Sequence, residues 1–234
     1  MMKKAITFSY DDGITQDIRL IEIFDKYNLK GTFNLNSGCF ESTMSIEQEG
    51  AVVSHHRLCS HEIDKVYKNH EVAAHTMNHL FLPDLSEQEI IYQVEKDRLN
   101  LSEIMGYEVV GMAYPCGGKN YNERVADIIQ KNTGIKYART LQTDDSFNIN
   151  SNLLCYKPTC HHHKHWSEMF ELGERFIELE TDIPKVFCIW GHSYEFDIYP
   201  ERWEAFEQFC EKISNKKDVF YGTNREIFLS KWYE

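Results

Sequence analysis

Long hydrophobic runs are missing from this chain of 234 residues. The longest, such as VFCIW at 186–190, is far shorter than the roughly 18 apolar residues that a membrane-spanning helix needs. The N-terminal stretch MMKKAITFSYDDG also lacks the apolar core and the small-residue cleavage site of a secretion signal. We therefore expect a cytoplasmic protein without a membrane partner.

Paired cysteines and clustered basic residues are absent as well. The seven cysteines include no C-x-x-C pair, and their odd number favours neither a disulfide framework nor a thiolate zinc site. The formal net charge is −12, and Lys and Arg form no patch of the kind that binds nucleic acid. We therefore expect mostly reduced cysteines and no nucleic-acid partner, and the oligomeric state stays open.

No linker rich in Gly, Ser or Pro and no repeat interrupts the chain. Instead, short β-rich runs alternate with amphipathic segments. Strands are predicted at 5–10, 31–36, 70–75, 108–115, 135–140, 185–190 and 218–222, with helices between them. This alternation indicates one α/β domain over residues 1–234, with a parallel sheet that is closed or nearly closed. Two long irregular stretches, 38–60 and 141–166, are candidates for the walls of a pocket.

The stretch FSYDDGITQD places two carboxylates, Asp11 and Asp12, directly after the first predicted strand. A surface turn is one interpretation, because Asp-Asp-Gly suits turns. The other is a metal site with an adjacent base, since the carboxyl ends of barrel strands converge on the active face.

Two histidines follow the third predicted strand in the sequence HTMNH. Their spacing of i and i+4 points both imidazoles of His75 and His79 in one direction on a helical turn. With eleven histidines in the chain, such a pair can arise by chance. A carboxylate at another strand end would complete a His-His-Asp set, which suits catalytic zinc or iron.

These motifs resemble those of the polysaccharide deacetylases with a NodB-type domain, carbohydrate esterase family 4. The family's T-F-D-D-G motif is similar to residues 7–13, TFSYDDG, and its H-[ST]-x-x-H motif is matched in full by residues 75–79. The resemblance covers roughly residues 3–195. It implies a distorted (β/α)7-type barrel and the metal-dependent hydrolysis of an N-acyl bond in a carbohydrate.

The resemblance also implies roles for single residues. Asp12, His75 and His79 would hold one divalent metal, with zinc the first choice and iron, cobalt or nickel as alternatives. Asp11 would be the general base that takes a proton from the attacking water. His192, at the end of FCIWGH, would be the general acid for the leaving amine, although a strand-end histidine bonded to a neighbour is the alternative.

The family's third motif, R-P-P-Y-G, is altered here to AYPCG, so that Ala113 replaces the arginine that orients the base. Arg139, at the exit of a nearby strand, is a candidate substitute, unless it only caps that strand. The backbone N–H of Cys116 takes the place of an oxyanion donor, while its thiol as a nucleophile is not required. Tyr114 and Pro115 of the same motif are candidates for substrate contacts.

The fourth motif of the family, an Asp-Trp pair, is matched only by Asp145 without the tryptophan. The cluster CHHHKHW at 160–166 could contact substrate, bind metal adventitiously or be a solvated loop, and His161 is its first candidate for the site. Trp190 and Tyr194 could stack on a sugar ring, although such aromatic residues are more often part of the core.

Three functions remain open at this stage. The first is deacetylation of an N-acetylated sugar or polysaccharide. The second is hydrolysis of a small cyclic ureide or imide, which the missing arginine and Asp-Trp pair keep in view. The third is a carbohydrate-binding protein without activity, against which the intact acid, base and ligand residues count.

Overall fold

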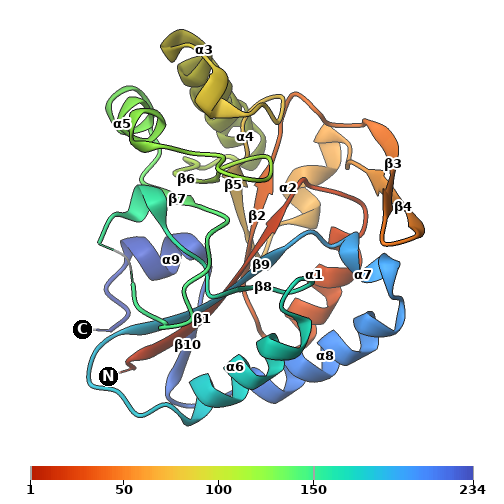
Figure 1. Cartoon of the computed structure of the whole chain (residues 1–234), viewed down its shortest axis with the longest axis vertical. Coiled ribbons are helices and arrows are strands. Elements are labelled where there is room, and N and C mark those ends of the chain that lie inside the picture. The colour runs from red at the N-terminus through yellow and green to blue at the C-terminus, as the bar shows by residue number, and fades with distance from the viewer. Residues whose placement is uncertain (1, 150, 234) are drawn as a thin grey trace.

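The structure is a computed structural model that describes residues 2–149 and 151–233. At its centre lies a curled sheet of eight strands, which is parallel throughout (Figure 1). Its order is β7-β6-β5-β2-β1-β9-β8, and β10 pairs with the first residues of β1. The strands are β1 (Lys4–Asp11), β2 (Gly31–Leu35), β5 (Glu71–Ala74), β6 (Gly111–Ala113), β7 (Tyr137–Arg139), β8 (Cys160–His161), β9 (Lys185–Gly191) and β10 (Val219–Tyr221).

The predicted barrel class is confirmed, but the sheet forms a half-barrel. In the described ranges the edge strands β7 and β8 are not paired, and the segment between them connects to β7 only through a bridge from Tyr156 to Arg139. Every residue of β1 and β2 is buried, as expected for the central strands of a parallel sheet.

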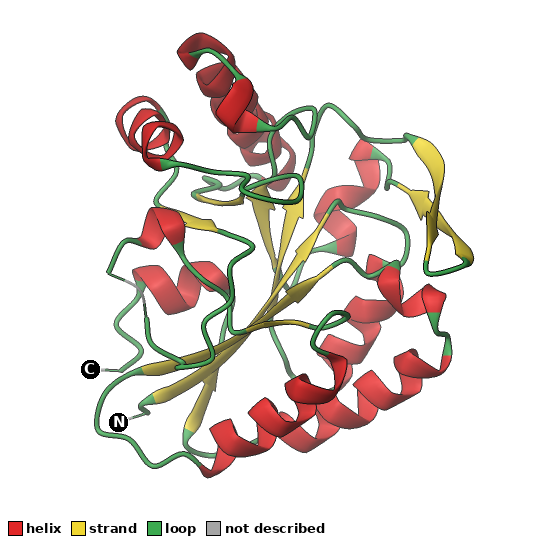
Figure 2. Cartoon of the chain, viewed as in Figure 1, coloured by secondary structure: helices red, strands yellow, loops and turns green. Residues whose placement is uncertain are grey.

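Helices cover the outside of this sheet (Figure 2). Ser86 and Glu89 form the predicted capping box of α3, and a π-helical turn at Tyr92–Lys96 joins that helix to α4, which ends at Gly106 in a left-handed conformation. None of the helices in the described part of the chain is both long and apolar enough to cross a membrane. The α-helices are α1 (Asp17–Lys26), α2 (Ile63–Val66), α3 (Glu87–Ile91), α4 (Asp97–Met105), α5 (Glu123–Asn132), α6 (Trp166–Glu178), α7 (Glu195–Ile198), α8 (Glu201–Ile213) and α9 (Asn224–Leu229).

The stretch 38–60, predicted to be irregular, contains an antiparallel hairpin of β3 (Thr43–Gln48) and β4 (Ala51–His56). Its two turn residues, Glu49 and Gly50, have φ angles of 53° and 82°, as a type I′ turn requires. The hairpin stands at one edge of the molecule beside α7 (Figure 1). The sequence did not indicate this hairpin, because Glu-Gly is not among the Asn-Gly, Asp-Gly and Gly-Gly pairs that mark such turns.

Candidate active site

A cavity of about 410 Å³ lies at the carboxyl ends of the central strands. Because parallel strands end on the same side, residues far apart in the sequence meet there. Ten of the predicted site residues line this cavity: Asp11, Asp12, His75, His79, Tyr114, Cys116, His161, Trp190, His192 and Tyr194. Residues of the hairpin and the segment that follows it, including Met44, His55 and Arg57, form another part of the wall.

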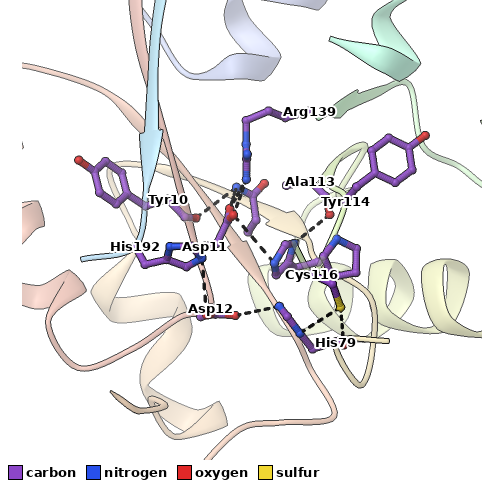
Figure 3. A network of polar contacts seen from close by, with 12 residues as sticks. Tyr10, Asp11, Asp12, His79, Ala113, Tyr114, Cys116, Arg139 and His192 are labelled. Carbon is purple, nitrogen blue, oxygen red and sulfur yellow. Dashed lines mark hydrogen bonds and ion pairs between the residues drawn. The ribbon is translucent and has the colours of Figure 1, made fainter. Parts of the chain in front are cut away.

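Asp11, the last residue of β1, forms a buried ion pair with Arg139 at the end of β7 (Figure 3). Both carboxylate oxygens of Asp11 contact Nη2 of Arg139, and Asn34 Nδ2 donates to Oδ1 over 2.8 Å. Burial by itself would raise the pKa of Asp11, but the Arg139 guanidinium, together with the nearby His75 and His192, outweighs burial and lowers it. Asp11 is therefore ionised at neutral pH.

Asp12 turns its carboxylate away from that pair. Its φ angle of 84° lies in the left-handed region, as does the 66° of Gly13, so the chain leaves β1 in a sharp turn. His55 Nε2 lies 3.0 Å from Oδ2, and Arg57 Nη2 donates to Oδ1 over 3.0 Å. Despite burial, the His55 contact and nearby positive charges hold the pKa of Asp12 well below its usual range.

Asp12, His75 and His79 have the geometry of a metal site. Their ligand atoms all lie within 4.8 Å of one another. Nδ1 of His75 is 2.9 Å from the carbonyl oxygen of Ala113, which fixes the proton on Nδ1 and leaves the lone pair of Nε2 facing the acids. His79 Nε2 is 3.6 Å from Asp12 Oδ1, too long for a good hydrogen bond but suitable for two ligands of one ion. These residues therefore fit the predicted divalent cation.

A second group of side chains that could bind a metal consists of His161, His192 and Glu195. In this group a histidine N–H, and not a lone pair, faces the carboxylate. Nδ1 of His161 accepts the backbone N–H groups of His163 and Lys164, so its proton lies on Nε2. This Nε2 faces the Glu195 carboxylate at 3.5 Å. A metal-bound histidine normally donates its other N–H to an acceptor. We therefore interpret this cluster as a buried carboxylate surrounded by donors.

Glu195 lies directly behind His192. The backbone N–H of His192 donates to Oε2 of Glu195 over 2.9 Å, and Nδ1 of the same histidine is 3.5 Å from that oxygen. Nε2 of His192 points toward Asp12, with 4.0 Å to Oδ2. Burial would lower the pKa of His192, but Glu195 raises it to about 9, so the imidazole carries a proton at neutral pH.

Cys116 lines the cavity at a turn after β6. Its φ angle is 67°, and in the described residues no hydrogen bond occupies its N–H. Its thiol lies 3.4 Å from the carbonyl oxygen of His79, and burial raises its pKa, so the thiol stays protonated at neutral pH. The residue is therefore suited to donate its N–H rather than to attack.

Four residues at this site that are not glycine have a positive φ. They are Asp12 (84°), Thr76 (64°), His79 (54°) and Cys116 (67°). Each such conformation costs about 1–3 kcal/mol and persists where the surrounding contacts enforce it. The strain therefore lies in the turns that carry Asp12, the two histidines of HTMNH and Cys116.

The predicted substrate contacts divide into two groups. Trp190 lies against the guanidinium of Arg139, 4.3 Å from ring centre to Cζ, and shares the wall with Tyr194. The hydroxyl of Tyr114 instead donates to the carbonyl oxygen of Leu154. Pro115 is buried beside the cavity without lining it, and exposed Asp145 lines a different cavity of about 570 Å³.

Four site residues were not predicted: Asn34, His55, Arg57 and Glu195. Asn34 lies within the predicted strand 31–36, two residues before its end, and Glu195 follows His192 by three residues, so only the nearness of Glu195 to a predicted site residue was a signal in the sequence. His55 and Arg57 reach the site only because the hairpin folds back over it, which no spacing in the sequence indicates.

At this site three carboxylates and five histidines line one cavity, and the buried Arg139 pairs with Asp11. The family model for polysaccharide deacetylases matches residues 1–138, more than half of the chain. The chain therefore belongs to the polysaccharide deacetylase family. The match includes Asp11, Asp12, His75 and His79, and it ends one residue before Arg139.

Solved structures share the fold at low sequence identity. A Mycobacterium smegmatis protein, provisionally classed as a polysaccharide deacetylase, has a TM-score of 0.66 and 16% identity, covering 97% of this chain and 89% of its own. The Xyl-CE4 domain of a multidomain xylanase from the hindgut metagenome of Trinervitermes trinervoides gives 0.61 and 15%, covering 98% and 91%. A mutant of BA3943, a CE4 family pseudoenzyme with restored activity, gives 0.58 and 17%, covering 96% and 67%. No curated protein sequence matches this chain.

Proposed function

We propose that this protein is a metal-dependent N-deacetylase that acts on an N-acetylated sugar or polysaccharide. The observation that carries the proposal is the separation of the two adjacent acids. Asp12 faces the histidines of the ligand set, whereas Asp11 is paired with Arg139. A solvated surface turn would not bury both carboxylates among different partners, since burying a charge is costly unless it is paired.

Asp12, His75 and His79 would hold the cation, zinc being the first choice. A divalent ion there supplies Lewis acidity, polarising the acyl carbonyl and making water easier to deprotonate. Asp11 is a weak base because its pKa is lowered. It would therefore act as the general base only for a water whose own pKa the cation lowers. Arg139 and Asn34 fix its carboxylate so that the proton is received at a defined position.

The Cys116 N–H would donate to the oxyanion of the tetrahedral intermediate. His192 would deliver a proton to the leaving amine, and Glu195 keeps that imidazole charged and oriented. Trp190 and Tyr194 supply apolar wall beside these groups, which suits an acyl group or a sugar face. Arg139 thus takes the place that Ala113 leaves open in the third motif. A cytoplasmic location stays a prediction.

Metal removal is the central test. Protein purified without chelator or nickel resin should contain one divalent ion per chain, and its removal should abolish amine release from N-acetylglucosamine derivatives. His79→Ala should hold less than about a tenth of the metal of the parent chain, since one of three ligands is lost. Elemental analysis and an amine assay measure both effects. Undiminished turnover by metal-free protein would refute the proposal.

A cyclic ureide hydrolase is the second candidate, because Asp145 lies outside the cavity and no Asp-Trp pair from the fourth motif is present there. Allantoin-like compounds tested beside the sugar derivatives separate the two activities. Oligosaccharide binding by metal-loaded protein without release of amine or ureide products would instead indicate a non-catalytic binding protein.

Replacing Cys116 with alanine tests the role of its backbone. We expect kcat to stay within about threefold, because the N–H remains and the raised pKa of the thiol argues against nucleophilic attack. Alanine keeps the strain of the positive φ unchanged, so the turn should persist. A loss beyond about a hundredfold in steady-state amine release would make the thiol a participant.

A further inference from the structure

Arg57 contacts more than the carboxylate of Asp12. Besides Oδ1 of Asp12, it reaches the backbone carbonyl of Asp12 through Nη1 over 2.8 Å. The same Nη1 donates to Oδ1 of Asn36 over 2.5 Å. The side chain of Arg57 is only 7% exposed, so this charge is compensated mainly by Asp12.

Asn36 extends the connection to the histidine turn. Its Nδ2 donates to the carbonyl oxygens of His75 (2.5 Å) and Thr76 (2.7 Å). One guanidinium thus joins the turn that carries Asp12 to the turn that carries His75 and His79. Both turns contain residues with positive φ, which need such enforcing contacts.

The backbone beside Arg57 holds the same strained turn. Leu58 N donates to the carbonyl oxygen of Gly13 over 3.0 Å, and Thr15 N donates to that of His56 over 2.8 Å. His55 occupies the second oxygen of Asp12 from the same segment. The carboxylate therefore has a fixed position and a compensating positive charge within the protein itself.

We propose that Arg57 is a positioning residue that supplies the counter-charge of Asp12 when no metal is bound, and that it competes with the ion for that carboxylate. This inference rests on the proposed function, because it takes Asp12, His75 and His79 as the ligand set. As a consequence, the site stays assembled without metal. It binds the ion less tightly than the same three ligands would without Arg57.

Two effects of Arg57 on metal affinity oppose each other. Fixing one short carboxylate side chain in advance favours binding by about tenfold at most. Repulsion between a guanidinium and a divalent ion that share one carboxylate is larger than this, even at an effective interior dielectric of about 20. The net effect of Arg57 is therefore to lower the affinity of the site for the metal.

The test is zinc affinity of the whole chain, measured by competition with a chromophoric chelator. Arg57→Met should bind zinc at least about tenfold more tightly than the parent chain. Its metal-free form should melt at a lower temperature, and zinc should raise that temperature by more than in the parent. Arg57→Lys, which keeps the charge, should bind zinc nearly as the parent does. Arg124→Met, at an exposed helix position, is the matched control.

Equal or weaker zinc binding by Arg57→Met would overturn the inference, because a merely structural role predicts weaker binding. A variant that stays unfolded in excess zinc would overturn it as well, since the ion should replace the lost charge. Comparing zinc binding by the parent chain and by His79→Ala tests the proposed function separately from the role of Arg57. If His79→Ala binds zinc as tightly as the parent, the ligand set itself is wrong and both statements fail.

Discussion

Replacing Asp11 with asparagine should lower kcat for amine release by about 10²- to 10⁴-fold, the range that general-base catalysis contributes. Asparagine keeps the shape of the side chain and removes its proton-accepting charge. Metal content should not change, because the proposed ligands are Asp12, His75 and His79, whereas Asp11 is paired with Arg139. Steady-state kinetics and elemental analysis of the same preparation measure the two effects.

The companion change is His192→Ala, which removes the proton donor and leaves both acids in place. We expect a similar loss for amide substrates, and a smaller one for an acyl ester whose leaving group needs no proton. If Asp11→Asn and His192→Ala each turn over the true substrate at the parent rate, the assigned roles are wrong.

Replacing Arg139 with methionine should destabilise the folded protein by about 3–5 kcal/mol at pH 7, since it leaves a buried charge without its partner. Arg139 has no exposed surface, and Asp11 is 2% exposed, so water cannot take over. Urea unfolding of the parent and variant measures this difference. Exposed Arg124→Met serves as the control. It removes two surface hydrogen bonds, to the carbonyl oxygens of Pro83 and Leu85, and we expect a loss of about 1 kcal/mol.

The stability that Arg139→Met loses relative to the parent chain, here called the deficit, should be larger at neutral pH than at acidic pH. In the parent, the pKa of Asp11 is lowered below its unfolded value of about 3.9, so the pair contributes stability above that pH and loses it as the pH falls. In the variant, burial still raises the pKa of Asp11, but the largest of the influences that lower it is gone, so ionisation of Asp11 opposes folding more strongly as the pH rises. The deficit should therefore be largest at pH 7 and shrink toward pH 4. A deficit that does not vary with pH would mean that packing against Trp190 dominates.

The predicted elements depended on local patterns, and these were sufficient for seven of the eight strands of the main sheet; the two-residue β8 lies in the stretch 141–166, which was predicted to be irregular. All seven predicted strands exist within their expected ranges or a residue beyond them, because each is a short buried run bounded by turn residues. Residues 38–60 differed, since the alternation along the hairpin is weak and many of its side chains are exposed. Its Glu-Gly turn is also not one of the pairs that mark a hairpin.

The sequence by itself determined the class of fold and predicted that Asp11, Asp12, His75, His79 and His192 meet at one face, because motif order and strand exits place these residues there. Only the tertiary structure decided which partners surround each carboxylate. Arg139 reaches Asp11 across the sheet, Arg57 reaches Asp12 from the segment after the hairpin, and Glu195 lies behind His192. Such pairings join segments whose separation along the chain carries no periodic signal, so they arise from packing and from the need to compensate each buried charge.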